Sequence, residues 1–124
     1  MRSIVLSNGQ LCVALDEHAL VRDIYYPYVG LEDHVRGHYI HRIGVWVNGK
    51  ISWFSEPGWR ITVACEDSAL ASRVVAVNDE LGVEIVSTDL IYNEEPVFVR
   101  RLSIKNISGE SRVIKLYFAH QFEI

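Results

Sequence analysis

Several features that commonly reveal a protein's function are scarce or missing in this sequence. Its 124 residues carry 12 Lys and Arg against 16 Asp and Glu, giving a formal net charge of −4 and a pI of about 5.7. Nucleic-acid phosphates are neutralised by basic surfaces, so we expect no nucleic-acid partner. No apolar run approaches the ~18 residues that span a bilayer, and the first ten residues lack a signal-peptide core. We therefore expect no membrane partner and a cytoplasmic location.

Cysteine is scarce, and short catalytic motifs are missing. Cys12 and Cys65 stand singly inside apolar stretches, without the close spacing of a metal or redox motif. We interpret both as small buried hydrophobic residues rather than as a disulfide. The sequence contains no nucleophile elbow, phosphate-binding glycine loop or dinucleotide fingerprint. It therefore indicates no cofactor, and we assign no catalytic residue.

What the sequence does contain is a dense series of strand and turn signals. The composition, 49% hydrophobic and 23% charged, is typical of one packed domain over residues 1–124. Asn8–Gly9 and Asn48–Gly49 each separate two apolar runs, and Asn-Gly accepts the positive φ angles of a type I′ hairpin turn. Two early hairpins favour an antiparallel sheet over a parallel one.

The second half of the chain continues this pattern. Residues 72–92 are predicted to form strand, turn and strand around residues 78–82, and residues 98–122 follow the same plan around residues 108–110. Arg100 and Arg101 should point to opposite faces of their strand. Only residues 66–73 could host a helical turn. We expect an all-β fold of nine or ten strands, arranged as an antiparallel β-sandwich.

One long irregular segment, residues 26–39, joins two of these predicted strands, and long loops on β scaffolds often carry function. Its start is rich in tyrosine, and three histidines follow near Glu32 and Asp33. Imidazole and carboxylate groups together could form a metal site or line a cleft, although the spacing matches no helical zinc motif. The candidate interface or cleft-margin residues are Tyr25, Tyr26, Tyr28, His34, His38 and His41.

Aromatic residues also gather around the second hairpin, where they could fill a core or stack on sugar rings. Trp46, inside a strand, is expected to pack in the sheet or core. Trp53 and Trp59 border the turn-like stretch "SEPGW" and are the candidates for carbohydrate stacking.

Taken together, these stretches resemble a known family. The segment from residue 4 to residue 54, and within it "DIYYPYVG" followed by "RIGVWVNGK", closely resembles the start of prokaryotic glucoamylase-like enzymes of glycoside hydrolase family 15, a group that includes glucodextranases and some trehalases. Residues 68–92 and 97–124 look like the same amino-terminal domain. The resemblance covers nearly the whole chain, but no short catalytic motif supports it.

The resemblance implies an antiparallel super-β-sandwich that precedes an α/α-barrel catalytic domain. In that family the catalytic glutamates lie in the barrel, which this chain does not reach, so no catalytic residue is carried over. The family's domain is longer than this chain, and we expect an incomplete sandwich. The substrate could be a starch-type glucan, dextran or trehalose.

Three functional classes follow. The leading one is a non-catalytic domain that supports folding and positioning of the catalytic barrel, with the tyrosine segment docked on the barrel or, alternatively, folded back on its own sandwich. The second is a carbohydrate-binding module that uses surface aromatics on an α-glucan. The third is a metal-dependent enzyme that uses the histidines. Uncovered strand edges also suggest a homodimer.

Overall fold

A computed structural model describes residues 2–30, 32–35 and 41–123. The described residues form ten strands and no helix, which confirms the expected all-β fold. The strands are β1 Ile4–Ser7, β2 Cys12–Leu15, β3 Val21–Tyr25, β4 Arg42–Val47, β5 Lys50–Trp53, β6 Trp59–Cys65, β7 Ser72–Asn78, β8 Val83–Ile91, β9 Phe98–Asn106 and β10 Ile114–Ala119.

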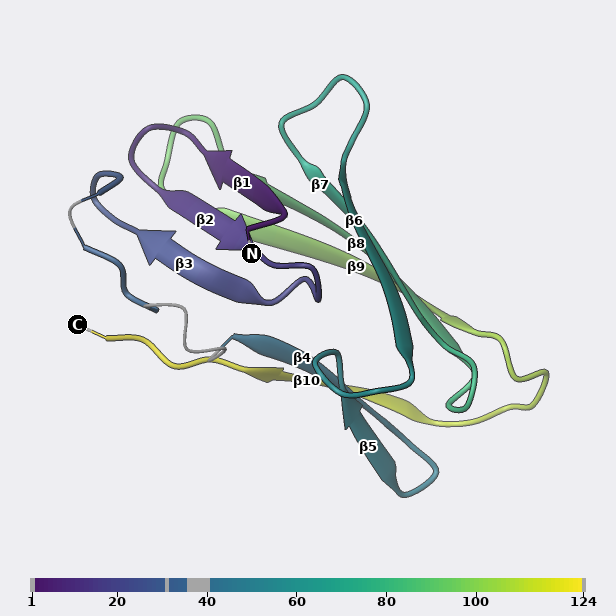
Figure 1. Ribbon diagram of the computed structural model, residues 1–124. Coiled ribbons are helices and arrows are strands. Elements are labelled where there is room, and N and C mark those ends of the chain that lie inside the picture. Colours follow the sequence, from purple (N-terminus) through teal and green to yellow (C-terminus); the bar gives the residue numbers. More distant parts are fainter. Residues whose placement is uncertain (1, 31, 36–40, 124) are drawn as a thin grey trace.

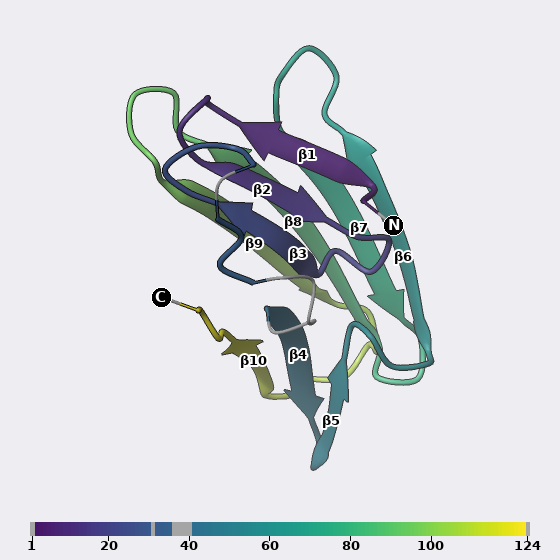
Figure 2. The same cartoon turned by 60° about the vertical axis from the view of Figure 1, so that its left-hand side comes forward.

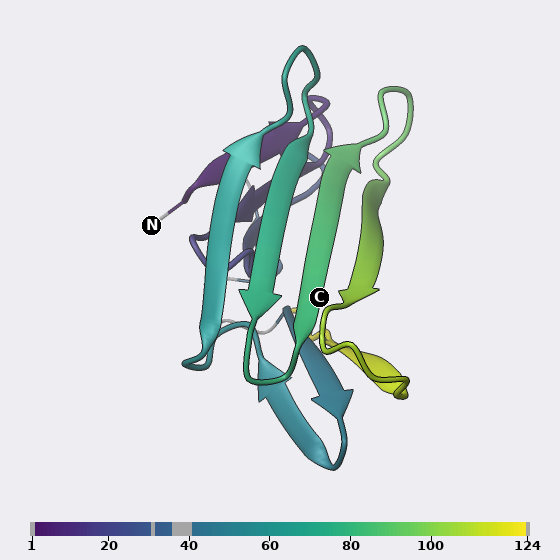
Figure 3. The ribbon, with the colours of Figure 1, turned by 90° about the vertical axis from the view of Figure 1, so that its right-hand side faces the viewer.

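The strands build three antiparallel sheets in two layers. Sheet A has the order β1-β2-β3, sheet B the order β10-β4-β5, and sheet C the order β6-β7-β8-β9. Sheets A and B lie against the same face of sheet C, one toward each end of its long strands (Figure 1, Figure 2). Figure 3 shows the opposite, outer face of sheet C, with β6 and β9 as its two borders. The arrangement confirms an antiparallel β-sandwich.

Strand alternation explains why these layers hold together. Along β8, every second side chain from Val83 to Ile91 is buried, and the residues between them are half-buried on the outer face. The buried rows form two apolar cores, one between sheets B and C and one between sheets A and C. Burying such rows between two sheets is the main stabilising term of a sandwich. Phe54 is among the largest fully buried side chains of the first core.

The two Asn-Gly turns differ in detail. Asn48 and Gly49 have φ angles of 50° and 82°, and Val47 pairs with Lys50, which confirms a two-residue type I′ hairpin. At the first turn the hairpin is confirmed, but the turn type is wrong. Ser7 pairs with Cys12 across a four-residue loop, in which the Asn8 side chain accepts hydrogen bonds from two following amides. An Asx turn has replaced the type I′ turn there.

The connection between β9 and β10 also departs from expectation. The turn lies where predicted, since β9 ends at Asn106 and Gly109 has a φ of 82°. However, β10 pairs with β4 and not with β9, so the chain crosses from sheet C to sheet B. The predicted strand-turn-strand plan holds, but the two strands do not pair as a hairpin. Alternation reveals which face of a strand is apolar, but it does not identify the neighbouring strand.

Cys65 and the possible helical turn at residues 66–73 differ from expectation. Cys12 is buried as predicted, whereas the prediction for Cys65 is wrong, because Cys65 ends the border strand β6 and is exposed. Residues 67–70 form turns rather than helix, with Ser68 at a φ of 65°. No helix in the described part of the chain is long and apolar enough to cross a membrane.

Candidate functional site

The candidate site is a cleft of about 460 Å³ at the side of the interlayer space that is bordered by β3, β9 and β10, which we call the open side. All three sheets contribute to its walls. The walls are mostly apolar, formed by Leu11, Val13, Val21, Ile24, Pro96, Phe98, Leu102, Phe118 and Phe122. Its polar groups are the guanidinium of Arg100 and the imidazoles of His41 and His120. A largely apolar cleft with a few converging polar groups is typical of a binding site.

Arg100 is held in this cleft by a buried polar network. Asp89 and Arg100 are direct partners across β8 and β9. The Arg100 Nε–H donates to Asp89 at 2.7 Å, and Nη2 reaches the second carboxylate oxygen at 3.3 Å. The hydroxyls of Ser72 and Ser87 donate to the same carboxylate, each at 2.8 Å. The Asp89 side chain is fully buried and that of Arg100 nearly so.

This network satisfies a charge that would otherwise be costly to bury. Removing ions from water is offset only by good geometry and additional hydrogen bonds, and here both carboxylate oxygens have partners. Arg100 also donates from Nη2 to the carbonyl of Ala19, which ties sheet C to the loop between β2 and β3. The Asp89 carboxylate therefore has a structural role. The part of the Arg100 guanidinium that is not bonded to Asp89 or Ala19 faces the cleft.

A histidine pair lines the same cleft as the arginine. The Nδ1 atoms of His41 and His120 are 3.0 Å apart, and His41 Nε2 lies 2.9 Å from the carbonyl oxygen of Gln121. Because a carbonyl only accepts, His41 donates from Nε2, and its Nδ1 accepts from His120. Burial lowers the pKa of His41, while the Gln121 carbonyl opposes this effect. Phe122 packs edge-on against the His41 ring at 4.5 Å.

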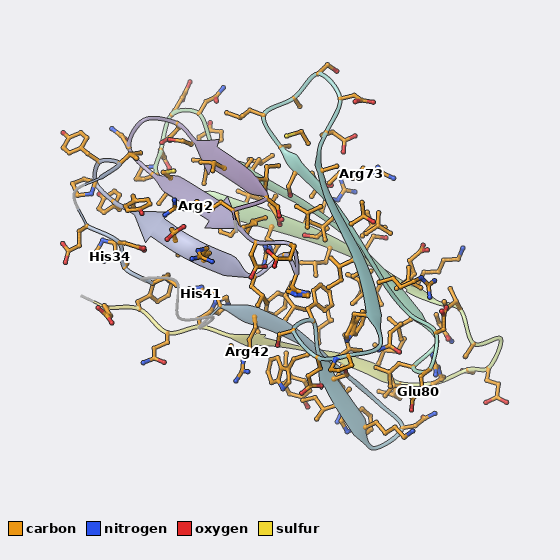
Figure 4. The ribbon with its side chains drawn as sticks, in the orientation of Figure 1. Arg2, His34, His41, Arg42, Arg73 and Glu80 are labelled. Atoms are coloured by element: carbon orange, nitrogen blue, oxygen red, sulfur yellow. The ribbon has the colours of Figure 1, made fainter. Side chains whose placement is uncertain are left out.

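His34 lies at the same side but in the opposite electrostatic situation. Its Nδ1 faces the carbonyl oxygen of Glu123 at 2.8 Å, and its Nε2 faces that of Tyr26 at 3.2 Å. Both carbonyls, that of Glu123 first, raise the pKa of His34 because both favour a protonated ring nitrogen. The Glu123 amide also donates to the His34 carbonyl at 2.9 Å. His34 and His41 thus both bind the segment that follows β10, and both are labelled near that segment in Figure 4.

The tyrosine segment leaves β3 beside these histidines. Tyr25 is the last residue of β3 and is half-buried, and its hydroxyl accepts a hydrogen bond from Arg2 at 3.3 Å. The rings of Tyr26 and Tyr28 are exposed. Tyr26 and Tyr28 therefore present apolar surface next to the open side, and both expectations for the tyrosine segment, docking on a barrel and capping its own sandwich, stay predictions.

The three predicted histidines do not come together as a described metal cluster. Among residues 2–30, 32–35 and 41–123, no group of three or more His, Cys, Asp or Glu side chains is placed to hold a metal ion. His34 and His41 each bind backbone carbonyls, and the partner of His41 is His120, which the sequence did not single out. His38 lies outside the described residues. A metal-dependent enzyme gains no support from these contacts.

The two predicted stacking tryptophans lie on different sides of their sheets. Trp59 packs between the layers against Phe54 at 4.7 Å and donates its ring N–H to Ser52 at 3.0 Å. Trp53 lies on the outer face of sheet B, across from Gly44. Trp59 therefore belongs to the margin of the core, and Trp53 alone of the two lies on an outer face.

Sequence reasoning missed Asp89, Arg100, His120 and the two phenylalanines Phe118 and Phe122. For Arg100 a signal was present, because it shares a row with Phe98 and Leu102, the apolar side of its strand. A charged residue in such a row requires a buried counter-ion. His120 and Phe122 carried no such signal, since nothing in the sequence indicates that β10 lies beside β4.

Comparison with known proteins identifies no relative. No known protein-family profile matches this chain, and no similar chain is found among curated proteins or solved structures.

Proposed function

We propose that this chain is a non-catalytic β-sandwich domain of a cytoplasmic, glucoamylase-like glycoside hydrolase, which supports the folding and positioning of a catalytic barrel in the same polypeptide. The proposal begins from the resemblance of residues 4–54 to that family's amino-terminal domain. The antiparallel sandwich agrees with the fold that the resemblance implies. The free thiols of Cys12 and Cys65 suit a reducing compartment.

One observation carries the proposal: inward-directed apolar side chains remain uncovered along the open side. Ile104 of β9 belongs to the row that faces the interlayer space, yet it is 41% exposed. Phe118 of β10 lies in the row of Ile43 on sheet B and is 43% exposed. In a closed sandwich such rows are dry. Their exposure supports further strands of the same polypeptide that extend the two layers past β9 and β10.

The tyrosine segment supplies the proposed contact with the barrel. Tyr26 and Tyr28 form exposed aromatic surface on a loop that His34 anchors to the chain after β10. Aromatic residues of this kind are enriched where protein surfaces meet. The described residues that line the cleft offer a guanidinium and two imidazoles as polar groups, and no carboxylate. A glycosidase requires a pair of carboxylates, which this proposal assigns to the barrel.

A pair of substitutions on one strand tests the proposal in the complete polypeptide. Val99 and Ile104 of β9 are both 41% exposed but lie on opposite faces. Ile104→Asp should strongly lower the yield of folded, active hydrolase, because the charge would be buried under the added strands. Val99→Asp, on the outer face, should leave the yield nearly unchanged. Equal yields from the two variants would contradict the proposal that further strands cover this face of β9.

Two measurements on the isolated chain complete the test. It should release no glucose from maltooligosaccharides, isomaltooligosaccharides or trehalose above a blank, and hydrolysis that co-purifies with the chain would overturn the non-catalytic assignment. It should also self-associate through the open side, with Phe118→Ser reducing the association. A monodisperse monomer across a concentration series in light scattering would contradict an uncovered apolar side.

A further inference from the structure

The outer face of sheet B carries an aromatic surface that the supporting role leaves unused. Along β4 the residues Ile43, Val45 and Val47 point into the core, so Gly44 and Trp46 point outward. Register places Tyr117, Gly44 and Trp53 in one row across the three strands. The next row holds Lys115, Trp46 and Ile51. We call these two rows the platform.

Gly44 allows the Trp53 ring to lie flat on the sheet. A Cβ atom at Gly44 would come within 2.6 to 2.9 Å of three carbons of the six-membered ring, closer than any side chain tolerates. Glycine inside a strand weakens it, and its use here fits the close approach of a ring. The Trp53 ring therefore lies directly over the β4 backbone, beside the exposed Tyr117.

Two cations lie over the tryptophan rings of the platform. The Arg42 guanidinium lies over the Trp53 ring, 4.8 Å from its centre, and Lys115 Nζ lies over the Trp46 ring, 4.6 Å from its centre. Neither takes part in any ion pair among the described residues. Figure 4 shows Arg42 directed away from sheet C. Aromatic rings and hydrogen-bond donors are therefore present together on this face.

We propose that the platform binds a neutral oligosaccharide, with a pyranose ring stacked on Trp53 and Tyr117 and its hydroxyls accepting hydrogen bonds from Arg42 and Lys115. A pyranose offers an apolar C–H face to the ring and hydroxyls at its rim. A dry protein interface would instead bury two unpaired cations, which is costly. The net charge of −4 disfavours a polyanion such as nucleic acid.

The choice of an α-glucan as first probe rests on the proposed function. The proposal that the platform binds a saccharide does not depend on that function. Isothermal titration and tryptophan emission are followed as the full chain is titrated with maltoheptaose, isomaltooligosaccharide, cellohexaose and a single-stranded oligonucleotide. Saturable binding of one of the neutral saccharides is expected. Binding of cellohexaose alone would support the platform while removing support for the α-glucosidic hydrolase. Binding of the oligonucleotide alone, or of no saccharide up to about 10 mM, would overturn the proposal.

Variants assign the binding to the platform. Trp53→Ala should weaken it by about tenfold or more, the usual loss of a central anchor ring. Tyr117→Ala should weaken it as well, and the control Tyr92→Ala should not, although Tyr92 is similarly exposed, at 48% against 42%. Unchanged affinity in Trp53→Ala would overturn the proposal.

Gly44→Ala provides a second route, since it lifts the ring without removing it. We expect weaker binding with all three tryptophans still present. If this variant does not fold, Trp53→Phe replaces it. That variant keeps a flat ring and should bind more tightly than Trp53→Ala, and equal affinities of the two would contradict stacking.

Discussion

Ile85 and Ile104 are paired across β8 and β9 on the same face of sheet C, yet one is fully buried and the other is 41% exposed. Both point into the interlayer space, as strand alternation requires. The difference lies in what covers them. Sheets A and B cover β7 and β8, whereas β9 forms the border at the open side. Alternation thus sets the direction of a side chain, and the opposing layer sets its burial.

The same contrast separates two ion pairs of sheet C. Asp89–Arg100 lies in the inner row within a network of serine hydroxyls. Arg60–Asp79 lies on the outer side, with both side chains about two-thirds exposed. Water solvates the second pair whether or not it forms, while the first has replaced its water with fixed partners. We expect loss of the Asp89–Arg100 pair to lower the free energy of unfolding much more than loss of the Arg60–Asp79 pair.

Removal of Arg100 should have the largest effect of the changes considered. Arg100→Met leaves the buried Asp89 carboxylate without its cation and should lower the free energy of unfolding by about 3–5 kcal/mol. The control Arg60→Met should have little effect, because that pair is solvated. Urea unfolding followed by tryptophan fluorescence measures both variants. Equal effects of the two changes would show that the inner network is not sealed from water.

The two isoleucines give the next largest contrast. Ile85→Ala opens a cavity under full cover and should lower the free energy of unfolding by about 2–5 kcal/mol. Ile104→Ala should cost less than about 1 kcal/mol in the isolated chain, because solvent reaches the vacated space. If the proposed longer polypeptide adds strands over β9, the cost of Ile104→Ala in it should rise toward that of Ile85→Ala. An unchanged small cost there would argue against added strands over β9.

Much of the covered region could be predicted from the sequence, and much of the open side could not. Period-two patterns located the strands, and Asn48–Gly49 predicted its turn type because local backbone preference decides it. The pairing of β10 with β4, the contact of His41 with His120 and the approach of Trp53 to Gly44 depend on residues distant in the chain. Local sequence patterns do not indicate which distant residues come into contact, so the site was harder to predict than the fold.

Histidines at the open side should respond to acid in opposite ways. His41 has a pKa below its ordinary value of 6.5, mainly through burial, helped by nearby His120 and Arg100. The unfolded chain therefore binds its proton at higher pH than the folded chain. The stability that His41 contributes is present above pH 6.5 and is lost as the pH falls through the folded pKa. His41→Gln should flatten the loss of stability on acidification.

His34 is the matched control for this change. Its pKa is raised by the Glu123 and Tyr26 carbonyls, so its contribution is present below pH 6.5 and is lost as the pH rises through the folded pKa. His34→Gln should therefore steepen the acid loss. Urea unfolding across about pH 5 to pH 8 measures both slopes. Slope changes of the same sign in the two variants would contradict the assigned environments.

The two cysteine thiols give the smallest expected effect on stability. Their labelling rates measure how well the fold shields each thiol from solvent. Cys12 is 4% exposed on sheet A, and burial raises its pKa, so little reactive thiolate is present. Cys65 is exposed at the end of β6. Iodoacetamide should label one thiol quickly in the native chain, and Cys65→Ser should abolish this phase with almost no change in unfolding free energy. Cys12 lies on the outer face of sheet A, beside Tyr25 and Val29, so its labelling should follow the rate at which these neighbours expose it. A native chain that labels both thiols at one rate would show that the residues around Cys12 on the outer face of sheet A do not shield its thiol.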